Sequence, residues 1–265
     1  MDLLAFFGLE ETADPRRWRL LVVPELCSGM GALFGGAGLG ACIEALERTT
    51  GRPLVWATAQ YLSYARPPAL VEIAVTGLVR GHYSSQARAV ATVEGEEIFT
   101  VNAALGRRPA PWRGQWAERI AVPAPDDSPP REDIPRHRGT LMDRIEMRIA
   151  KARPPEEPRG APGDGHSALW VRLPDLDMSA ATLAIVGDFV PFGVREALGQ
   201  PVGGNSLDNT LRVMHHHHAT EWLLADVRVH AVADGFGHGL VHLWADDGTL
   251  LATASQSSIV REWRE

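Results

Sequence analysis

The sequence contains the same order of predicted elements twice, and this repeat constrains the fold more than any other feature. In each half, one strand leads into a long hydrophobic helix, and four strands with alternating apolar and polar residues follow. A single helix followed by an antiparallel sheet is typical of an α+β fold in which the sheet wraps around the helix. The repetition indicates a tandem duplication. The predicted ranges are strand 18–23, helix 36–48 and strands 54–64, 70–80, 83–93 and 96–105, then strand 169–173, helix 178–198 and strands 206–214, 220–231, 237–245 and 249–261.

A proline-rich stretch separates the two halves. Between Pro109 and Pro162 lie 11 of the 19 prolines of the chain, together with clusters of charged residues. This composition predicts a long irregular connector that contains one short helix or strand around 141–152. We therefore expect three parts, which are a first unit at 1–108, a linker at 109–165 and a second unit at 166–265.

Composition excludes several classes of protein. The 265 residues, 45% of them hydrophobic, are enough to bury a core without stabilisation by disulfides or metal ions. The net charge of −7 argues against a surface for nucleic acid or anionic membranes. Only two cysteines occur, no apolar run reaches the roughly 18 residues of a membrane span, and the first residues lack the basic region of a secretory signal. We expect a cytoplasmic protein that binds neither nucleic acid nor membranes.

One carboxylate lies where the predicted fold has no ordinary place for a charge. Asp188 is the only ionisable residue in the apolar stretch 178–194, and its helical neighbours are apolar. A buried, unpaired charge is costly, so Asp188 needs hydrogen-bond partners or a raised pKa. The candidate partners are Ser206, which opens the next strand, and Gln256, which shares a strand face with small and apolar residues. Three polar groups on an apolar background indicate a hydrolytic site.

Each of these three residues also has a purely structural explanation. Asp188 could cap a turn before Pro191, Ser206 could be an ordinary turn serine, and Gln256 could be a core amide with satisfied hydrogen bonds. The residues alone leave both interpretations open.

Two further patterns are similar to cofactor sites. Residues 36–41 fit the G-x-G-x-x-A pattern of dinucleotide-binding loops, but no strand directly precedes them and no acidic residue lies about 20 positions on. The run His215–His218 and the pair His238 and His242, which share a strand face, make a metal site conceivable. No cysteine lies nearby and the spacing matches no known ligand set, which favours solvated histidines. We predict no cofactor and no metal.

The order of the candidate residues resembles that of a known family. The chain resembles the double-hotdog acyl-CoA thioesterases of the bacterial thioesterase II and peroxisomal acyl-CoA thioesterase type, over most of its length outside the linker. The matching features are Leu-Phe-Gly-Gly at 33–36, Arg-Pro at 66–67 and the strand around 98–105 in the first half, and Asp188, Ser206-Leu-Asp208, Trp222-Leu-Leu224 and Gln256 in the second.

This resemblance implies a tandem (double) hotdog fold, in which each unit is a long central helix wrapped by a curved antiparallel sheet. It implies hydrolysis of an acyl-CoA, with the catalytic Asp, Ser or Thr, and Gln of the family carried over to Asp188, Ser206 and Gln256. A homo-oligomer is expected. The alternative is a non-catalytic binder of acyl or lipid-like ligands, since fold does not guarantee activity. A dehydratase or acyltransferase is less favoured, because no pair of histidine and acid is apparent.

The three residues would act through a bound water molecule. A buried Asp188 could hold and deprotonate water, with its pKa raised toward neutrality by burial, while Ser206 and Gln256 orient the water. The backbone N–H groups of Gly35 and Gly36, at the start of a helix, could stabilise the oxyanion.

The chain departs from the family where substrate would be recognised. Asn209 stands where a histidine is common, and residues 57–61 read Ala-Thr-Ala-Gln-Tyr instead of a version that contains histidine. Thr58 and Gln60 are therefore expected to contact the substrate, and the chemical class of the acyl group stays open.

Overall fold

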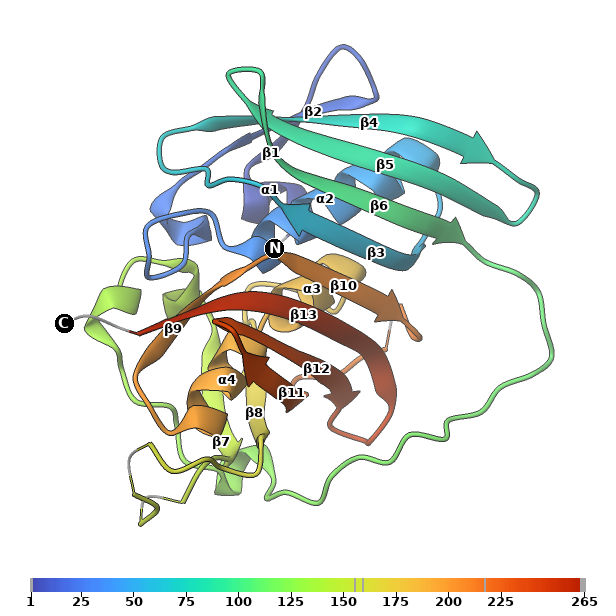
Figure 1. Cartoon of the computed structure of the whole chain (residues 1–265). Helices are drawn as coiled ribbons and strands as arrows, with labels where there is room; N and C mark the ends of the chain where they lie inside the picture. The colour runs from blue at the N-terminus through green and yellow to red at the C-terminus, as the bar shows by residue number, and fades with distance from the viewer. Residues whose placement is uncertain (1, 155, 159, 217, 263–265) are drawn as a thin grey trace.

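The regular structure consists of one curved antiparallel sheet and the helices that it wraps (Figure 1). The computed structural model describes residues 2–154, 156–158, 160–216 and 218–262. The helices are α1 Leu3–Phe7, α2 Gly35–Thr50, α3 Ala180–Val186 and α4 Val190–Leu198, and the 3₁₀ turns are η1 Pro24–Leu26, η2 Pro125–Asp127, η3 Pro135–His137 and η4 Leu141–Arg144. The strands are β1 Leu9–Glu11, β2 Arg17–Leu21, β3 Leu54–Tyr61, β4 Leu70–Arg80, β5 Ser84–Val93, β6 Glu96–Gly106, β7 Glu146–Lys151, β8 His166–Arg172, β9 Val202–Ser206, β10 Asp208–Val213, β11 Leu223–Ala233, β12 Phe236–Ala245 and β13 Leu250–Glu262.

The two halves of the chain share this sheet. Its 13 strands run in the order β1-β2-β4-β5-β6-β3-β10-β13-β12-β11-β8-β7, and β9 pairs with β13. The seam between the halves is the antiparallel pair β3 and β10, in which Thr58 lies opposite Thr210 and their hydroxyls are 2.6 Å apart. The prediction of one continuous antiparallel sheet is confirmed.

Helix α2 lies inside the curve of the first half. Every residue from Gly36 to Leu46 is buried, as expected for a helix that is apolar nearly all round. The helix ends at Thr50 and is capped by Gly51, whose positive φ of 67° suits glycine. Gly36 and Gly40 face α3, and a Cβ on either would lie within 3.0 Å of its backbone. These glycines let the central helices of the two halves contact each other closely.

The central helix of the second half is broken, so the prediction of one continuous helix over 178–198 is wrong. Ser179 caps α3 by accepting a hydrogen bond from the Thr182 N–H, α3 ends at Val186, and α4 begins at Val190. Pro191 explains the break, because proline has no N–H to donate and its ring would clash with the carbonyl four residues earlier. Asp188 therefore lies in the break between the two helices instead of in the middle of one.

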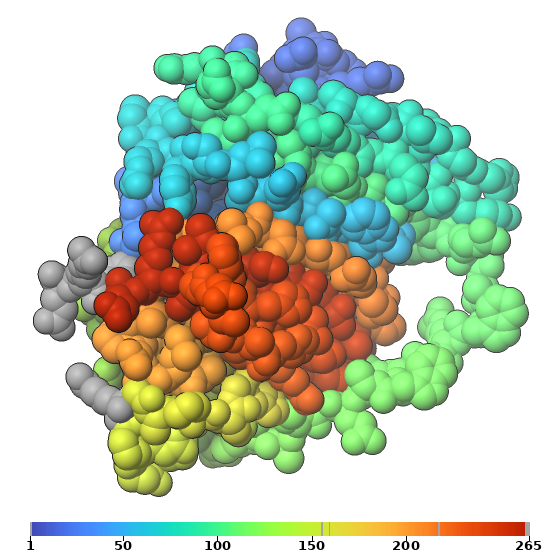
Figure 2. All heavy atoms as spheres, in the orientation of Figure 1, coloured from blue at the N-terminus to red at the C-terminus, as the bar shows by residue number. Residues whose placement is uncertain are grey.

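The proline-rich stretch combines an irregular part with a part that joins the sheet. After β6 the chain stands off the body of the molecule before it reaches the second half (Figure 2). It then covers an apolar cluster on the outer face of the second half, where Trp170 donates from Nε1 to the Pro123 carbonyl at 2.9 Å. Strand β7 extends the sheet beside β8. None of the described helices is both long and apolar enough to cross a membrane.

Candidate active site

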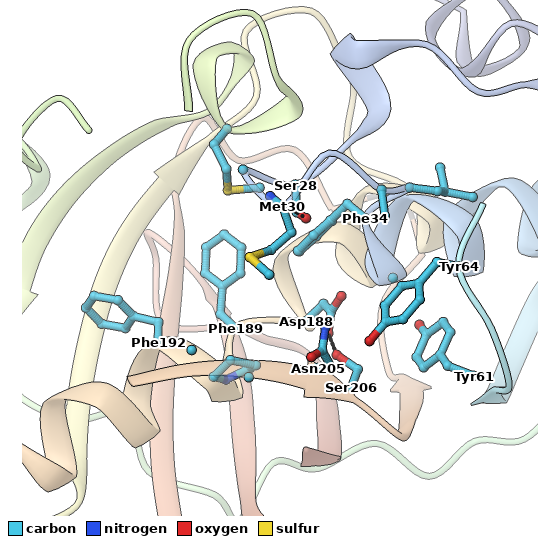
Figure 3. Close-up of a pocket in the computed structure, with 18 of the residues that line it drawn as sticks. Ser28, Met30, Phe34, Tyr61, Tyr64, Asp188, Phe189, Phe192, Asn205 and Ser206 are labelled. Atoms are coloured by element: carbon cyan, nitrogen blue, oxygen red, sulfur yellow. Dashed lines mark hydrogen bonds between the residues drawn. The ribbon is translucent and has the colours of Figure 1, made fainter. Parts of the chain in front are cut away.

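A cavity of about 510 Å³ lies between the two halves. Its volume is within the roughly 300–1,000 Å³ common for small-molecule sites. The start of α2, the end of β3, the break between α3 and α4, and β9 all contribute to its wall. Asp188 and Ser206 lie near its middle, with Tyr61 and Tyr64 on one side and Phe189 on the other (Figure 3).

The structure brings Asp188, Ser206 and Gln256 together. Ser206 donates from Oγ to Asp188 Oδ1 at 3.1 Å, and Gln256 donates from Nε2 to the same carboxylate oxygen. Gln256 also donates to Ser206 Oγ at 2.6 Å. The other carboxylate oxygen of Asp188, Oδ2, accepts from the backbone N–H of Gly36 at 2.7 Å. Residues from both halves therefore hold one carboxylate that is only 4% exposed.

Local structure explains this convergence. Inward-facing positions of β13 alternate, so Gln256 lies in line with the buried Ala252, Ala254 and Ser258. Strand β9 pairs with β13 so that Ser206 lies opposite Ser258. Ser258 is the next inward-facing residue of β13 after Gln256. The break before α4 then turns Asp188 toward both side chains.

Burial raises the pKa of Asp188 to about 7. Desolvation is the largest cause, and the hydrogen bonds from Gly36, Ser206 and Gln256 lower the value only in part. Asn209 also lowers the pKa of Asp188, by a smaller amount, although its amide forms no hydrogen bond with the described residues. The carboxyl can therefore exchange a proton near neutral pH, which suits a general base.

Two polar side chains at the site were not predicted to act there. The Tyr61 hydroxyl and the Asn209 amide are buried and have no hydrogen-bond partner among the described residues. Burial, and then the nearby Asp188 carboxylate, raise the pKa of Tyr61 well above its usual value, so its hydroxyl stays protonated. The alternation of β3 carries a usable signal, because Tyr61 shares the inward face with Ala57 and Ala59.

Two residues predicted to contact substrate lie elsewhere. Thr58 and Gln60 alternate with the buried Ala57 and Ala59, so they face the outer side of the sheet. Thr58 bonds across the seam to Thr210, Gln60 is exposed, and neither is among the residues that line the cavity. The structure therefore places neither residue on the wall of this cavity, and their contact with the substrate stays a prediction.

The two glycines at the start of α2 differ in their roles. The N–H of Gly36 is engaged by Asp188, whereas the N–H of Gly35 has no acceptor among the described residues. A Cβ on Gly35 would lie 2.7 Å from Asp188 Oδ2 and 3.1 Å from the Tyr61 hydroxyl oxygen. Glycine is required at position 35 because these two polar groups approach the backbone so closely.

The histidines form no metal centre within the described part of the chain, where no group of three or more possible ligands could hold an ion. His218 pairs with Asp247 at 2.9 Å, and the rings of His230 and His238 lie 5.1 Å apart. His217, in the middle of the predicted cluster, lies outside the described residues.

Comparison with protein families gives a match to the acyl-CoA thioesterase C-terminal domain over residues 125–260, which is 136 of the 265 residues. The chain belongs to the acyl-CoA thioesterase family. This thioesterase is 33% identical to a candidate thioesterase from Novosphingobium aromaticivorans, with 96% of this chain and 98% of that chain covered and a TM-score of 0.84. Comparison with curated protein sequences gave no match.

More distant structures agree on the fold of the thioesterase. A protein of unknown function with a hotdog fold from Alicyclobacillus acidocaldarius is 21% identical, with 99% of this chain and 98% of that chain covered and a TM-score of 0.85. An acyl-CoA thioesterase II from Mycobacterium marinum is 21% identical, with 99% of both chains covered and a TM-score of 0.77. The fold is therefore a hotdog fold, and the enzyme is a thioesterase.

Proposed function

We propose that this thioesterase hydrolyses an acyl-CoA to the free acid and coenzyme A, with Asp188 as the general base for the attacking water. One observation carries the proposal, which is the buried carboxyl of Asp188 at the cavity wall, held by neutral donors and with a pKa of about 7. A base whose pKa is close to the working pH is the most effective in proton transfer. Ser206 and Gln256 orient the carboxylate and the water that it holds.

The proposed reaction has two steps. Water attacks the carbonyl carbon of the thioester while Asp188 takes one of its protons, and a tetrahedral oxyanion forms. The bond between carbon and sulfur then breaks, its electron pair leaves on sulfur, and Asp188 returns the proton to the thiolate. The products are the acid and the thiol, and Asp188 is again a carboxylate.

Two donors are suited to the oxyanion. The Tyr61 hydroxyl is protonated and has no partner among the residues that the structure describes, and the Gly35 N–H lies beside it at the positive end of α2. We assign these two groups, instead of Gly36, to stabilise the negative charge that develops on the carbonyl oxygen.

We also propose the finer organisation of the enzyme. The two halves are two hotdog units in tandem, at 1–108 and 166–265, joined by the linker 109–165. The equivalent order of elements around α2 and around the α3–α4 pair supports this division. We expect a homo-oligomer, which light scattering after gel filtration measures directly.

Turnover of a substrate panel tests the function. Release of thiol is measured with acyl-CoA substrates from acetyl to palmitoyl and with aromatic acyl groups. We expect at least one of them to be hydrolysed. Tight binding of acyl-CoA with no turnover of any substrate would contradict the proposal and favour a binding protein.

The pH dependence of kcat/KM tests the role of Asp188. Because the base must be deprotonated, kcat/KM should fall about tenfold per pH unit below the Asp188 pKa of about 7 and level off above it. Ser206→Ala removes a hydrogen bond to the charged form of Asp188, so it should raise the pKa of that carboxyl further. The fall of kcat/KM at low pH should therefore shift to higher pH. A profile that is flat between pH 5 and about 8 would contradict the assignment.

A further inference from the structure

Basic side chains gather at one part of the cavity that holds Asp188. They come from two separate segments, since η3 and the chain before it supply two arginines and a histidine, and α4 supplies one arginine. Besides Asp188, Glu262 is the acidic residue among the described residues that line the cavity. The basic cluster consists of Arg131, Arg136, His137 and Arg195, whose charges act on one another.

Two of the arginines in this cluster are held without a salt bridge to the described residues. Arg131 and Arg195 form no ion pair with any carboxylate of the described residues. Instead, Arg131 contacts Met147, with Nη1 3.2 Å from Sδ, and its guanidinium lies 5.6 Å from the centre of the Phe192 ring. A guanidinium held against apolar side chains without a counter-ion, with the exposed Arg195 close enough to lower its pKa, indicates a site for an anion.

The cations also repel one another. Burial lowers the pKa of Arg131, and the charges of Arg195 and Arg136 lower it further, while Glu196 offsets this only in part. Burial and then Arg131 lower the pKa of His137 to about 4, so His137 is neutral at physiological pH and the arginines supply the charge. Such crowding of like charges is unfavourable unless a ligand neutralises it.

The position of the cluster fits the two ends of a CoA thioester. Arg131 lies over Phe192, and Phe192 is on the side of Asp188 opposite Tyr61 and Tyr64 (Figure 3). The cavity therefore has an end with tyrosines, the carboxylate near its middle and a cationic end. An acyl-CoA has the same order, with the acyl chain, the thioester, and then the phosphates beyond the pantetheine arm.

We infer that the basic cluster binds the phosphate groups of the coenzyme A part of the substrate, and that the connector between the halves supplies Arg131 and Arg136 to this site. The inference rests on the proposed function and goes beyond it, because it assigns recognition of the leaving group to named side chains. Arginine suits this role because its planar group binds phosphate oxygens through two parallel hydrogen bonds.

The test compares two substrates with the same acyl group, one on coenzyme A and one on pantetheine, which has no phosphate. In the double variant Arg131→Gln/Arg195→Gln, the ratio of kcat/KM for the CoA substrate to that for the pantetheine substrate should fall at least about tenfold, mainly through KM. The matched control is Arg138→Gln, on the same connector but outside the cavity and paired with Asp133 at 2.6 Å. It should leave the ratio unchanged.

The inference and the proposed function fail in different ways. A wild-type enzyme that uses both substrates equally well, or a double variant with an unchanged ratio, would overturn the phosphate site and leave hydrolysis intact. If no substrate is hydrolysed, calorimetry still tests the site, since wild-type protein should bind coenzyme A at least about tenfold more tightly than pantetheine and the double variant should lose that preference. Equal affinity of the wild-type protein for both ligands would overturn it.

Discussion

An Asp188→Asn variant should lose about 10²- to 10⁴-fold in kcat, because the amide has the size of the carboxylate but cannot accept a proton from water. Binding of acyl-CoA should persist, since the cavity keeps its shape. Thiol release and calorimetry on the same preparation measure the two effects. A variant that keeps most of its turnover would remove Asp188 from the reaction.

Thermal unfolding at pH 8 is the control for this variant. The folded-state pKa of Asp188, about 7, lies above the ordinary 3.8, so the stability that its protonated form provides is complete below 3.8 and is lost as the pH rises through 7. At pH 8 the substitution removes this buried charge, but it also turns the amide NH₂ toward one of the donors Gly36, Ser206 or Gln256. These effects oppose each other, so we expect a small change in Tm. A large loss of Tm would assign the loss of activity to misfolding.

A Gly36→Ala variant should also be strongly impaired. Its Cβ would lie 2.7 Å from the Ala184 carbonyl oxygen and 2.8 Å from Ile185 Cα, so α2 and α3 must move apart. We expect a loss of about 1–3 kcal/mol in the free energy of unfolding from overpacking. The shift also moves the Gly36 N–H away from Asp188, and displacement of a catalytic group by about 1 Å can lower kcat/KM by about 10²-fold.

Gly40→Ala is the matched control. A Cβ on Gly40 would lie 3.0 Å from the Ala181 carbonyl oxygen. The substitution therefore crowds the same contact between α2 and α3 without touching Asp188. Gly40→Ala should lower the free energy of unfolding, but the variant should retain most of its activity at a temperature where it is folded. Equal loss of activity in the two variants would show that the spacing of the helices, and not the hydrogen bond to Asp188, is responsible.

Local pattern was sufficient to predict most of the sheet and the three residues that converge. Asp188 was found because a charge in an apolar stretch is costly, and Gln256 because an amide shared a strand face with alanines. The apolar character of the stretch favours one continuous helix, whereas the missing N–H of Pro191 is the signal for the break.

The outward direction of Thr58 and Gln60 is also within reach of local pattern, because they alternate with Ala57 and Ala59 along β3, whereas a motif alone does not assign the faces of the strand. The basic cluster brings Arg131 close to Arg195, which is far from it in the sequence, and no local pattern contains that contact. Composition alone predicts an irregular connector, because the stretch is rich in proline and charged residues. It does not show that part of the connector lies against the cavity.

The central claim is that Asp188 delivers a water molecule and does not itself attack the thioester. A single turnover with excess enzyme in ¹⁸O-labelled water, followed by mass spectrometry of the acid and of the enzyme, tests it most directly. We predict that the released acid carries one ¹⁸O atom and that the peptide containing Asp188 carries neither label nor acyl group. An acylated enzyme, or ¹⁸O in the Asp188 carboxyl, would contradict the claim and assign Asp188 as a nucleophile.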